Sequence, residues 1–243
     1  MRSKHPPTGS AFWLYGLHAA RAALVNRRRK VKRAVLTDRA LGELGSALGS
    51  VPVETTSPEA VGRLLPSGAV HQGIALLCDP LPALDLETVL GNGEPGRIVA
   101  VLDQITDPHN EGAILRSAAA FGAAAVVVQD RHAPPESGAL AKAASGALDI
   151  VPRIVTVNIA RTLEELGEMG FWRIALAADG DAPLAQSARP GDIALVFGAE
   201  GAGLRRLVRQ RCDIAAFIPI ARGMESLNVS NAAAIAFYEL AKR

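Results

Sequence analysis

The chain has 243 residues, of which 49% are hydrophobic and 21% are charged, values that exclude a chain disordered throughout. The uncharged stretch Leu64–Cys78 is interrupted by Pro66 and Gly68 and is too short to cross a bilayer, so we expect no membrane segment. No apolar core of a secretory signal follows the basic start, and the two cysteines form neither a metal-ligand pattern nor a disulfide framework. We therefore expect no metal and a cytoplasmic location.

The charge is distributed unevenly, although the net formal charge is only +2. Residues 1–39 carry ten basic residues and one acidic residue, whereas residues 40–243 are net acidic. The densest basic run comprises Arg27, Arg28, Arg29, Lys30, Lys32 and Arg33. Such a run is typical of a patch that contacts RNA phosphates, and equally of a solvated loop between a helix and a strand.

Residues 11–79 predict a small α/β domain after a basic leader, residues 1–10, for which disorder is one expectation. Apolar residues at helical spacing predict a helix over 12–25. Ser57 followed by Pro58 predicts the start of a second helix. Short strands are predicted at 34–37, 51–53 and 71–78.

Residues 80–96 are rich in proline and glycine and predict a linker. Within them, Gly91–Gly96 satisfies the G-x-G-x-x-G pattern of dinucleotide-binding proteins. That fingerprint needs a strand before it and a helix after it. Here a strand follows, and Pro95 occupies the place where the helix would open, so the linker is the favoured interpretation.

Residues 97–243 predict one α/β domain in which strands and helices alternate. The strands are continuous apolar runs at 98–103, 124–129, 153–157, 173–178, 193–198 and 214–220. The helices lie at 111–121, 136–147, 160–169, 203–210 and 229–242. This pattern is typical of a parallel sheet covered by helices on both faces.

Polar residues stand after three of these strands. Asn110, which could cap the following helix, and Arg116 come after the first. Glu200 stands in a glycine-rich turn, and Ser226 and Asn228 precede the last helix, where one of them could serve as its cap. Taken singly, a cap, a turn and a surface arginine explain these residues. Because the carboxyl ends of parallel strands share one edge, their convergence favours a ligand site.

The motifs DPHNEGAILRSAAAFGA, FGAEGAGL and IPIARGMESLNVSNAAAIAFYEL resemble the three motifs of the SpoU family, RNA 2′-O-ribose methyltransferases of the SPOUT superfamily. GLHAARAAL and HQGIA are similar to the small ribosomal-protein-like substrate-binding domain found in that family. This second resemblance points to the bacterial branch that methylates guanosine in 23S ribosomal RNA.

The resemblance implies a parallel-sheet domain whose C-terminal stretch forms a trefoil knot, a small N-terminal α/β RNA-binding domain, and a homodimer with the site near the subunit interface. It implies S-adenosylmethionine as cofactor, contacted by Gly198, Ile218 and Leu227. It assigns the catalytic set to Asn110, Arg116, Glu200, Ser226 and Asn228.

The resemblance nominates Arg116 as the base for the ribose hydroxyl. Because a guanidinium is normally protonated, a second role stays open, in which Arg116 anchors a phosphate and stabilises a developing alkoxide. Transfer RNA is the alternative substrate, and a catalytically silent RNA-binding or ribosome-assembly factor is the alternative function. A nucleotide-dependent oxidoreductase is disfavoured, because Leu102–Asn110 carries no glycine fingerprint.

Overall fold

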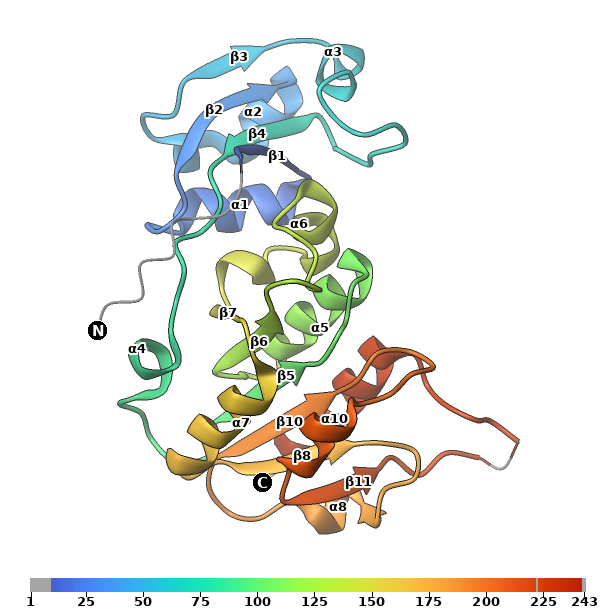
Figure 1. Ribbon diagram of the computed structural model, residues 1–243. Coiled ribbons are helices and arrows are strands. Elements are labelled where there is room, and N and C mark those ends of the chain that lie inside the picture. Colours follow the sequence, from blue (N-terminus) through green and yellow to red (C-terminus); the bar gives the residue numbers. More distant parts are fainter. Residues whose placement is uncertain (1–9, 222, 242–243) are drawn as a thin grey trace. The chain divides into compact units, whose positions relative to one another are not determined.

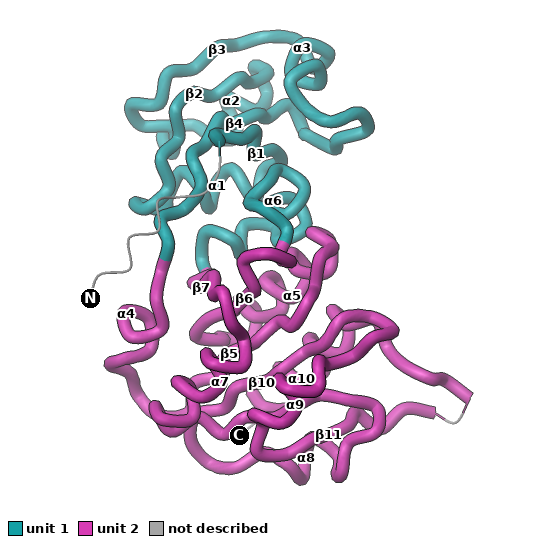
Figure 2. Tube along the Cα trace, in the orientation of Figure 1, with its two compact units in different colours: residues 1–83, 134–150 teal, residues 84–133, 151–243 magenta. Residues whose placement is uncertain are grey.

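The computed structural model describes residues 10–221 and 223–241 (Figure 1). The predicted leader therefore lies, except for its last residue, outside the described part. The chain forms two compact units (Figure 2). Unit 1 comprises residues 1–83 and 134–150, and unit 2 comprises residues 84–133 and 151–243. This differs from the expectation of two consecutive domains, in which the segment 134–150 belongs to the second.

Unit 1 is built on a four-stranded sheet in the order β1-β4-β2-β3. Its strands are β1 (Phe12–Tyr15), β2 (Val31–Leu36), β3 (Val53–Thr55) and β4 (Ile74–Cys78). β4 pairs antiparallel with both β1 and β2, and β3 pairs parallel with β2. The sheet, with its helices, forms the small α/β unit that the sequence predicts.

The helix predicted over 12–25 is wrong in its first part. Residues 12–15 form β1, which pairs with β4 from Phe12 opposite Cys78 to Tyr15 opposite Ala75. The helix α1 (Leu17–Val25) begins only after Gly16, whose φ of 90° lies in a region that favours glycine. The aromatic run therefore joins the sheet, and Gly16 makes the turn into the helix.

The other helices of unit 1 are short. They are α2 (Asp38–Leu44), α3 (Pro58–Gly62), α6 (Gly138–Ala144) and the 3-10 helices η1 (Gly45–Leu48) and η2 (Ala147–Asp149). The predicted start of α3 is confirmed, since the Ser57 side chain accepts a hydrogen bond from the amide of Ala60. Thr37 caps α2, a helix that the sequence reading missed, in the same way.

Arg29 is not the exposed phosphate contact that its place in the basic run predicts. Its side chain is 0% exposed and pairs with Asp149 at 2.8 Å and with Glu136 at 2.6 Å. Burial opposes the charged form of Arg29, but hydrogen bonds and charges from the two carboxylates outweigh it and raise its pKa. Arg29 therefore ties the segment 134–150 to the rest of unit 1.

Unit 2 is built on a seven-stranded sheet in the order β7-β6-β5-β10-β8-β11-β9, and every pairing in it is parallel. Its strands are β5 (Ile98–Leu102), β6 (Ala125–Gln129), β7 (Arg153–Thr156), β8 (Trp172–Leu176), β9 (Ala182–Pro183), β10 (Ile193–Phe197) and β11 (Ile214–Phe217). The predicted parallel sheet is confirmed, and β9 is an additional short strand.

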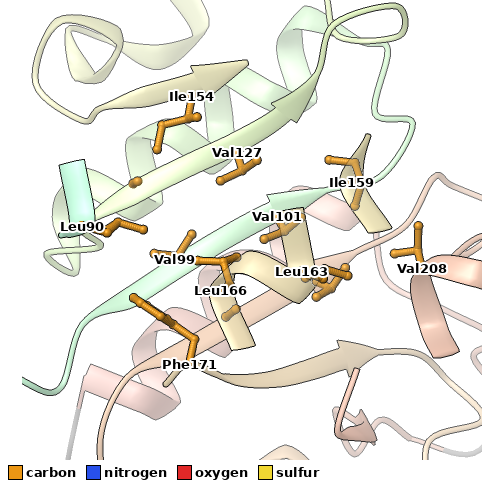
Figure 3. Close-up of a cluster of buried hydrophobic side chains, with 13 residues drawn as sticks. Leu90, Val99, Val101, Val127, Ile154, Ile159, Leu163, Leu166, Phe171 and Val208 are labelled. Carbon is orange, nitrogen blue, oxygen red and sulfur yellow. The ribbon is translucent and has the colours of Figure 1, made fainter. Parts of the chain in front are cut away.

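Helices cover the sheet of unit 2 because its central strands are apolar on both faces. The helices are α4 (Leu86–Leu90), α5 (Pro108–Ala120), α7 (Ile159–Glu168), α8 (Leu184–Ser187), α9 (Arg206–Gln210) and α10 (Val229–Ala241). On one face, Val99 and Val101 of β5 pack with Leu163 of α7 and with side chains of α4 and α9 (Figure 3). On the other, Phe197 of β10 packs against Phe237 of α10.

α5 and α10 lie side by side and run in the same direction. Near their starts, Asn228 donates a hydrogen bond to Asn110, and near their ends, the rings of Phe121 and Tyr238 meet with centroids 6.0 Å apart. Among residues 10–221 and 223–241, none of the helices combines the length and the apolar character that a membrane span requires.

We predict that Arg29→Ala destabilises unit 1. The substitution leaves the buried carboxylates of Glu136 and Asp149 without their counter-charge, which typically costs about 3–5 kcal/mol. The free energy of unfolding from urea titrations measures the loss. The control is Arg39→Ala, because Arg39 is 88% exposed and its pair with Glu43 contributes less than about 1 kcal/mol. Equal losses in both variants contradict the role of Arg29.

Candidate active site

The carboxyl ends of the central strands of unit 2 lie at one edge of the sheet. Leu102 at the end of β5 pairs with Phe197 at the end of β10, which pairs with Leu176 at the end of β8. The segments that follow these strands, and the one after β11, start from this edge. They contain the polar residues that the sequence singled out, so the predicted convergence has its structural basis here.

A cavity of about 690 Å³ lies among these segments. It is lined by Leu176, Ala177, Ala178, Phe197, Gly198, Ala199, Glu200, Gly201, Gly203, Ile218, Ile220, Glu225, Ser226, Leu227, Asn228, Val229 and Ala232. Its walls are mostly apolar side chains and backbone, with two carboxylates, a hydroxyl and an amide among them. That is the composition of a small-molecule site.

One wall of the cavity is a glycine turn that folds back on itself. Ala199 and Gly203 exchange two backbone hydrogen bonds, of 3.2 and 2.9 Å. At Gly198 a Cβ atom would lie 2.3 Å from the carbonyl carbon of Gly203 and 2.5 Å from the amide nitrogen of Leu204. Glycine at 198 is therefore required by close backbone approach, and the turn presents Glu200 at its exposed tip.

Three of the predicted polar residues meet beside the cavity, which is lined by Glu200 and Asn228 but not by Asn110. The amide nitrogen of Asn228 donates to Oδ1 of Asn110 at 3.0 Å and to Oε1 of Glu200 at 2.5 Å. The amide of Asn110 donates to the same oxygen of Glu200 at 3.4 Å. The starts of α5 and α10 and the glycine turn are joined through these three side chains, which come from positions up to 118 residues apart.

Asn228 is also the N-cap of α10, for which the sequence offered Ser226 and Asn228 as candidates. Its Oδ1 accepts from the amides of Ser230 and Asn231, at 2.9 and 3.4 Å, and from the Ser230 hydroxyl. Both ends of its side-chain amide are therefore used. The expectation that Asn110 caps α5 is wrong, because Asp107 does so by accepting from the amide of His109. Asn110 lies in the first turn, where its side chain is directed to Glu200.

Ser226 and Arg116 are placed differently from these three. Ser226 lines the cavity, but its side chain makes no hydrogen bond with any residue that the structure describes. Arg116 is exposed on α5, is absent from the cavity lining, and has no ion pair within the described residues. Gly198, Ile218 and Leu227, the predicted cofactor contacts, all line the cavity.

Sequence reasoning missed two parts of this site. Leu176, Ala177 and Ala178 at the end of β8 line the cavity, as does Glu225. For the three residues at the end of β8 the signal in the sequence was their position, because the end of β8 lies at the same sheet edge as the ends of β5 and β10. No group of three or more histidine, cysteine, aspartate or glutamate side chains in the described ranges is arranged to hold a metal ion.

Comparison with known proteins decides the family. The sequence profile of the SpoU rRNA Methylase family matches residues 97–238. This chain belongs to the SpoU rRNA methylase family. A second profile, RNA 2′-O ribose methyltransferase substrate binding, matches residues 13–84. The family resemblance expected from the three motifs is thereby confirmed.

Relatives match nearly the whole chain. It is 36% identical over 239 residues to the 23S rRNA (guanosine-2′-O-)-methyltransferase RlmB of Vibrio vulnificus (strain CMCP6), covering 95% of this chain and 96% of the relative. It is 38% identical over 240 residues to the protein of the same name from Coxiella burnetii (strain RSA 493 / Nine Mile phase I), covering 95% of each.

Solved structures of the SpoU family share the fold. The SpoU methyltransferase AviRb from Streptomyces viridochromogenes aligns with a TM-score of 0.82 at 21% identity, covering 96% of this chain and 89% of that one. A structure of AviRb in complex with the cofactor AdoMet aligns with a TM-score of 0.80 at 23% identity, covering the same shares. These likenesses support the α/β fold of the described units.

We predict that Gly198→Ala distorts the glycine turn and destabilises the protein. The added methyl group would overlap the backbone of Gly203 and Leu204, and overpacking of this kind typically costs about 1–3 kcal/mol. Urea unfolding measures the change. Gly42→Ala in α2 is the control, because its Cβ would have no atom within 4 Å, so it should be neutral or mildly stabilising. An unchanged stability of Gly198→Ala contradicts the close approach.

Proposed function

We propose that this chain transfers a methyl group from S-adenosylmethionine to the ribose 2′-hydroxyl of a guanosine in 23S ribosomal RNA. The observation that carries the proposal is the cavity at the sheet edge, with the Asn110–Glu200–Asn228 cluster at its wall. The names of the relatives that match 95% of the chain support the substrate. We propose the cytoplasm as the compartment, because the substrate is found there.

The cavity suits S-adenosylmethionine in size and lining. Its volume of about 690 Å³ lies in the range of about 300–1,000 Å³ that is usual for ligand pockets. Gly198, Ile218 and Leu227 would contact the donor, with apolar wall for the adenine and backbone groups for its polar edge. The carboxylates of Glu200 and Glu225 suit the positive charges of the sulfonium and ammonium groups. When bound, the donor supplies the electrophilic methyl group.

The polar cluster would act mainly by positioning. Asn228 holds the Glu200 carboxylate and the Asn110 amide in one arrangement, while its own oxygen is fixed by the first turn of α10. A preorganised set of this kind orients a ribose hydroxyl at little entropic cost. Ser226, whose hydroxyl has no partner among the described residues, would be free to contact the ribose.

Arg116 would act on the hydroxyl proton or on the charge that develops when the proton leaves. As a base it would accept the proton, and as an anchor it would hold the neighbouring phosphate and stabilise the alkoxide. Both roles require Arg116 to approach a substrate that reaches the cavity. Its exposure on α5, outside the cavity of its own chain, supports a site that a second copy completes.

The proposed second copy is a homodimer partner on the α5–α10 face. Ile235 and Tyr238 of α10 are 42% and 53% exposed and lie close to one helix turn apart, and Tyr238 contacts Phe121 of α5. An apolar strip of this kind favours burial against another chain. Arg116 lies on α5, next to α10, and in such a dimer its side chain would reach the cavity of the partner subunit.

We further propose that the C-terminal stretch of unit 2 is threaded as a trefoil knot. The family membership of residues 97–238 supports this topology, and so does the likeness to solved SpoU structures. β10 lies between β5 and β8, and the helix that ends the described chain, α10, returns to α5. Residues from α10 and its preceding segment would then line the cofactor cavity together with the glycine turn.

Unit 1 would select the RNA through its basic run. Arg27, Arg28 and Lys30 are exposed between α1 and β2, while Lys32 and Arg33 pair with Asp79 and Glu54 at the surface. Arg29 is excluded from this patch by its burial. Exposed guanidinium and ammonium groups contact phosphates without reading the base sequence. The substrate-binding profile over residues 13–84 supports this assignment.

We predict that Arg116→Ala abolishes methylation without loss of cofactor binding. In cells that lack the protein, mapping of ribose methylation across total RNA should show the loss of one 2′-O-methylguanosine from 23S rRNA. Wild-type protein should restore it, and Arg116→Ala should not, because loss of a general base or charge stabiliser typically costs about 10²–10⁴-fold in rate. Titration calorimetry with S-adenosylmethionine should give wild-type affinity for the variant.

The control for this variant is Arg161→Ala, which removes an exposed arginine from α7 of the same unit. It should restore methylation fully. Restored methylation by Arg116→Ala removes the assigned mechanism. An unchanged methylation map in cells lacking the protein, together with RNA binding by the purified chain, favours the silent assembly factor, and loss of a methyl group from transfer RNA favours the alternative substrate.

We predict that replacing Arg27, Arg28 and Lys30 together by alanine weakens RNA binding. The plot of log affinity against log salt concentration should become shallower, by about 0.7 for each phosphate of single-stranded RNA that the variant no longer neutralises. Fluorescence anisotropy with a 23S rRNA fragment measures both quantities. The charge-matched control replaces the exposed Arg21, Arg39 and Arg63 of the same unit. The same slope change in both variants means that net charge, and not this patch, sets the affinity.

A further inference from the structure

A buried carboxylate stands just behind the cavity. Asp103 follows β5 and is 0% exposed. Its oxygens accept two hydrogen bonds from one residue, Arg205: from the backbone amide at 3.0 Å and from Nε at 2.8 Å, and Nη2 of the same guanidinium lies 2.6 Å from Oδ1 in an ion pair. Nη2 of Arg205 also donates to Gln129 at the end of β6, at 3.1 Å. Arg205 is thereby fixed to the carboxyl ends of two neighbouring strands.

Arg205 ends the segment that carries Glu200. The loop 198–204 leaves the sheet after Phe197 of β10, forms the glycine turn, and meets Arg205 immediately before α9. The backbone amide of Asp103 donates to the carbonyl of Phe197 at 2.8 Å. Asp103 therefore binds both ends of the loop, the first through its backbone and the second through its side chain.

Between these two anchors, Leu204 packs against the core and Ala199 is hydrogen-bonded to Gly203, but the tip of the loop has few attachments. Glu200, Gly201, Ala202 and Gly203 are exposed, and within the described residues Glu200 reaches the sheet edge through the side-chain amides of Asn110 and Asn228 alone. A loop built on three glycines has high conformational entropy when free. Its position, and with it one wall of the cavity, therefore depends on the anchors at its ends.

We propose that Asp103 and Arg205 are a positioning pair, which holds loop 198–204 so that the cofactor cavity is formed before S-adenosylmethionine binds. Neither residue lines the cavity, so the pair acts through the loop. In this pair only the Asp103 carboxylate is buried, and an ion pair of this kind adds little net stability compared with apolar side chains of similar volume, which leaves geometry as its contribution. This proposal rests on the proposed function for the identity of the ligand, but not for the order of the loop.

The sheet of unit 2 contains a matched control at its opposite edge. Before β10, Asp192 accepts hydrogen bonds from the backbone amide and from the guanidinium of Arg97, the residue before β5. As in the Asp103–Arg205 pair, an aspartate accepts hydrogen bonds from the backbone and the guanidinium of one arginine, and the strands involved are again β5 and β10. The Asp192–Arg97 pair, however, lies at the amino ends of these strands, away from the cavity. Asp192→Asn therefore reports the purely structural effect of losing such a carboxylate.

The test compares full-length wild type, Asp103→Asn and Asp192→Asn. Titration calorimetry should show the Kd for S-adenosylmethionine raised about tenfold or more in Asp103→Asn, since charge-assisted hydrogen bonds are among the strong ones, and unchanged in Asp192→Asn. Hydrogen exchange followed by mass spectrometry should show faster exchange of the amides of 198–204 in Asp103→Asn only. Thermal unfolding of all three proteins measures how much each substitution lowers the unfolding temperature, so that the two variants can be compared at known stability.

Equal Kd values and equal exchange in wild type and Asp103→Asn overturn the proposal, as does the same change in Asp192→Asn. If wild type binds no S-adenosylmethionine, the proposed function fails. Hydrogen exchange of the amides of 198–204 then still tests whether Asp103 and Arg205 hold the loop in place. If Asp103→Asn does not fold, Arg205→Lys provides the second variant. Arg205 is 38% exposed, and lysine keeps the positive charge but lacks the planar guanidinium that contacts the carboxylate with two nitrogens. This variant should also speed exchange in the loop.

Discussion

The parallel register of the strands of unit 2 is the constraint from which the site follows. β5, β10 and β8 end at the same level, at Leu102, Phe197 and Leu176, so the chain must turn three times at one edge. Parallel strands with both faces buried need helices on each side, and the turns after β5 and β10 lead into the helices α5 and α9. The backbone hydrogen bonds of the sheet therefore place polar side chains that are distant in sequence at the same edge.

Within that frame, single residues serve the fold and the site at once. Asn228 completes the first turn of α10 and holds Glu200 with the same amide group. Gly198 is required because backbone passes where a side chain would stand, and the same closeness shapes the cavity wall. Because these residues have two tasks, substitutions in them disturb stability and chemistry together. Residues that act on the loop from behind, such as Asp103, allow the two effects to be separated.

The sequence predicted much of unit 2 and less of unit 1. The apolar runs 98–102 and 193–197 within the predicted strands indicated burial on both faces of the sheet. The convergence of Asn110, Glu200 and Asn228 followed from their places after strands. Local patterns failed where the partner is remote. The helical spacing of Leu17, Ala20 and Leu24 does not extend to the aromatic residues of β1, which pair with β4. The burial of Arg29 depends on Glu136 and Asp149, more than 100 residues away.

The insertion of residues 134–150 into unit 1 also matters for how such a chain can be divided or recombined. A cut near residue 84, where the substrate-binding profile ends, would remove α6 and η2 from the unit and leave the Arg29 guanidinium without the carboxylates of Glu136 and Asp149. Exchange of this unit between relatives therefore requires two exchanged segments, because residues 134–150 must come from the same relative as residues 1–83. Recombination at a single junction would take Arg29 from one relative and its partners Glu136 and Asp149 from another.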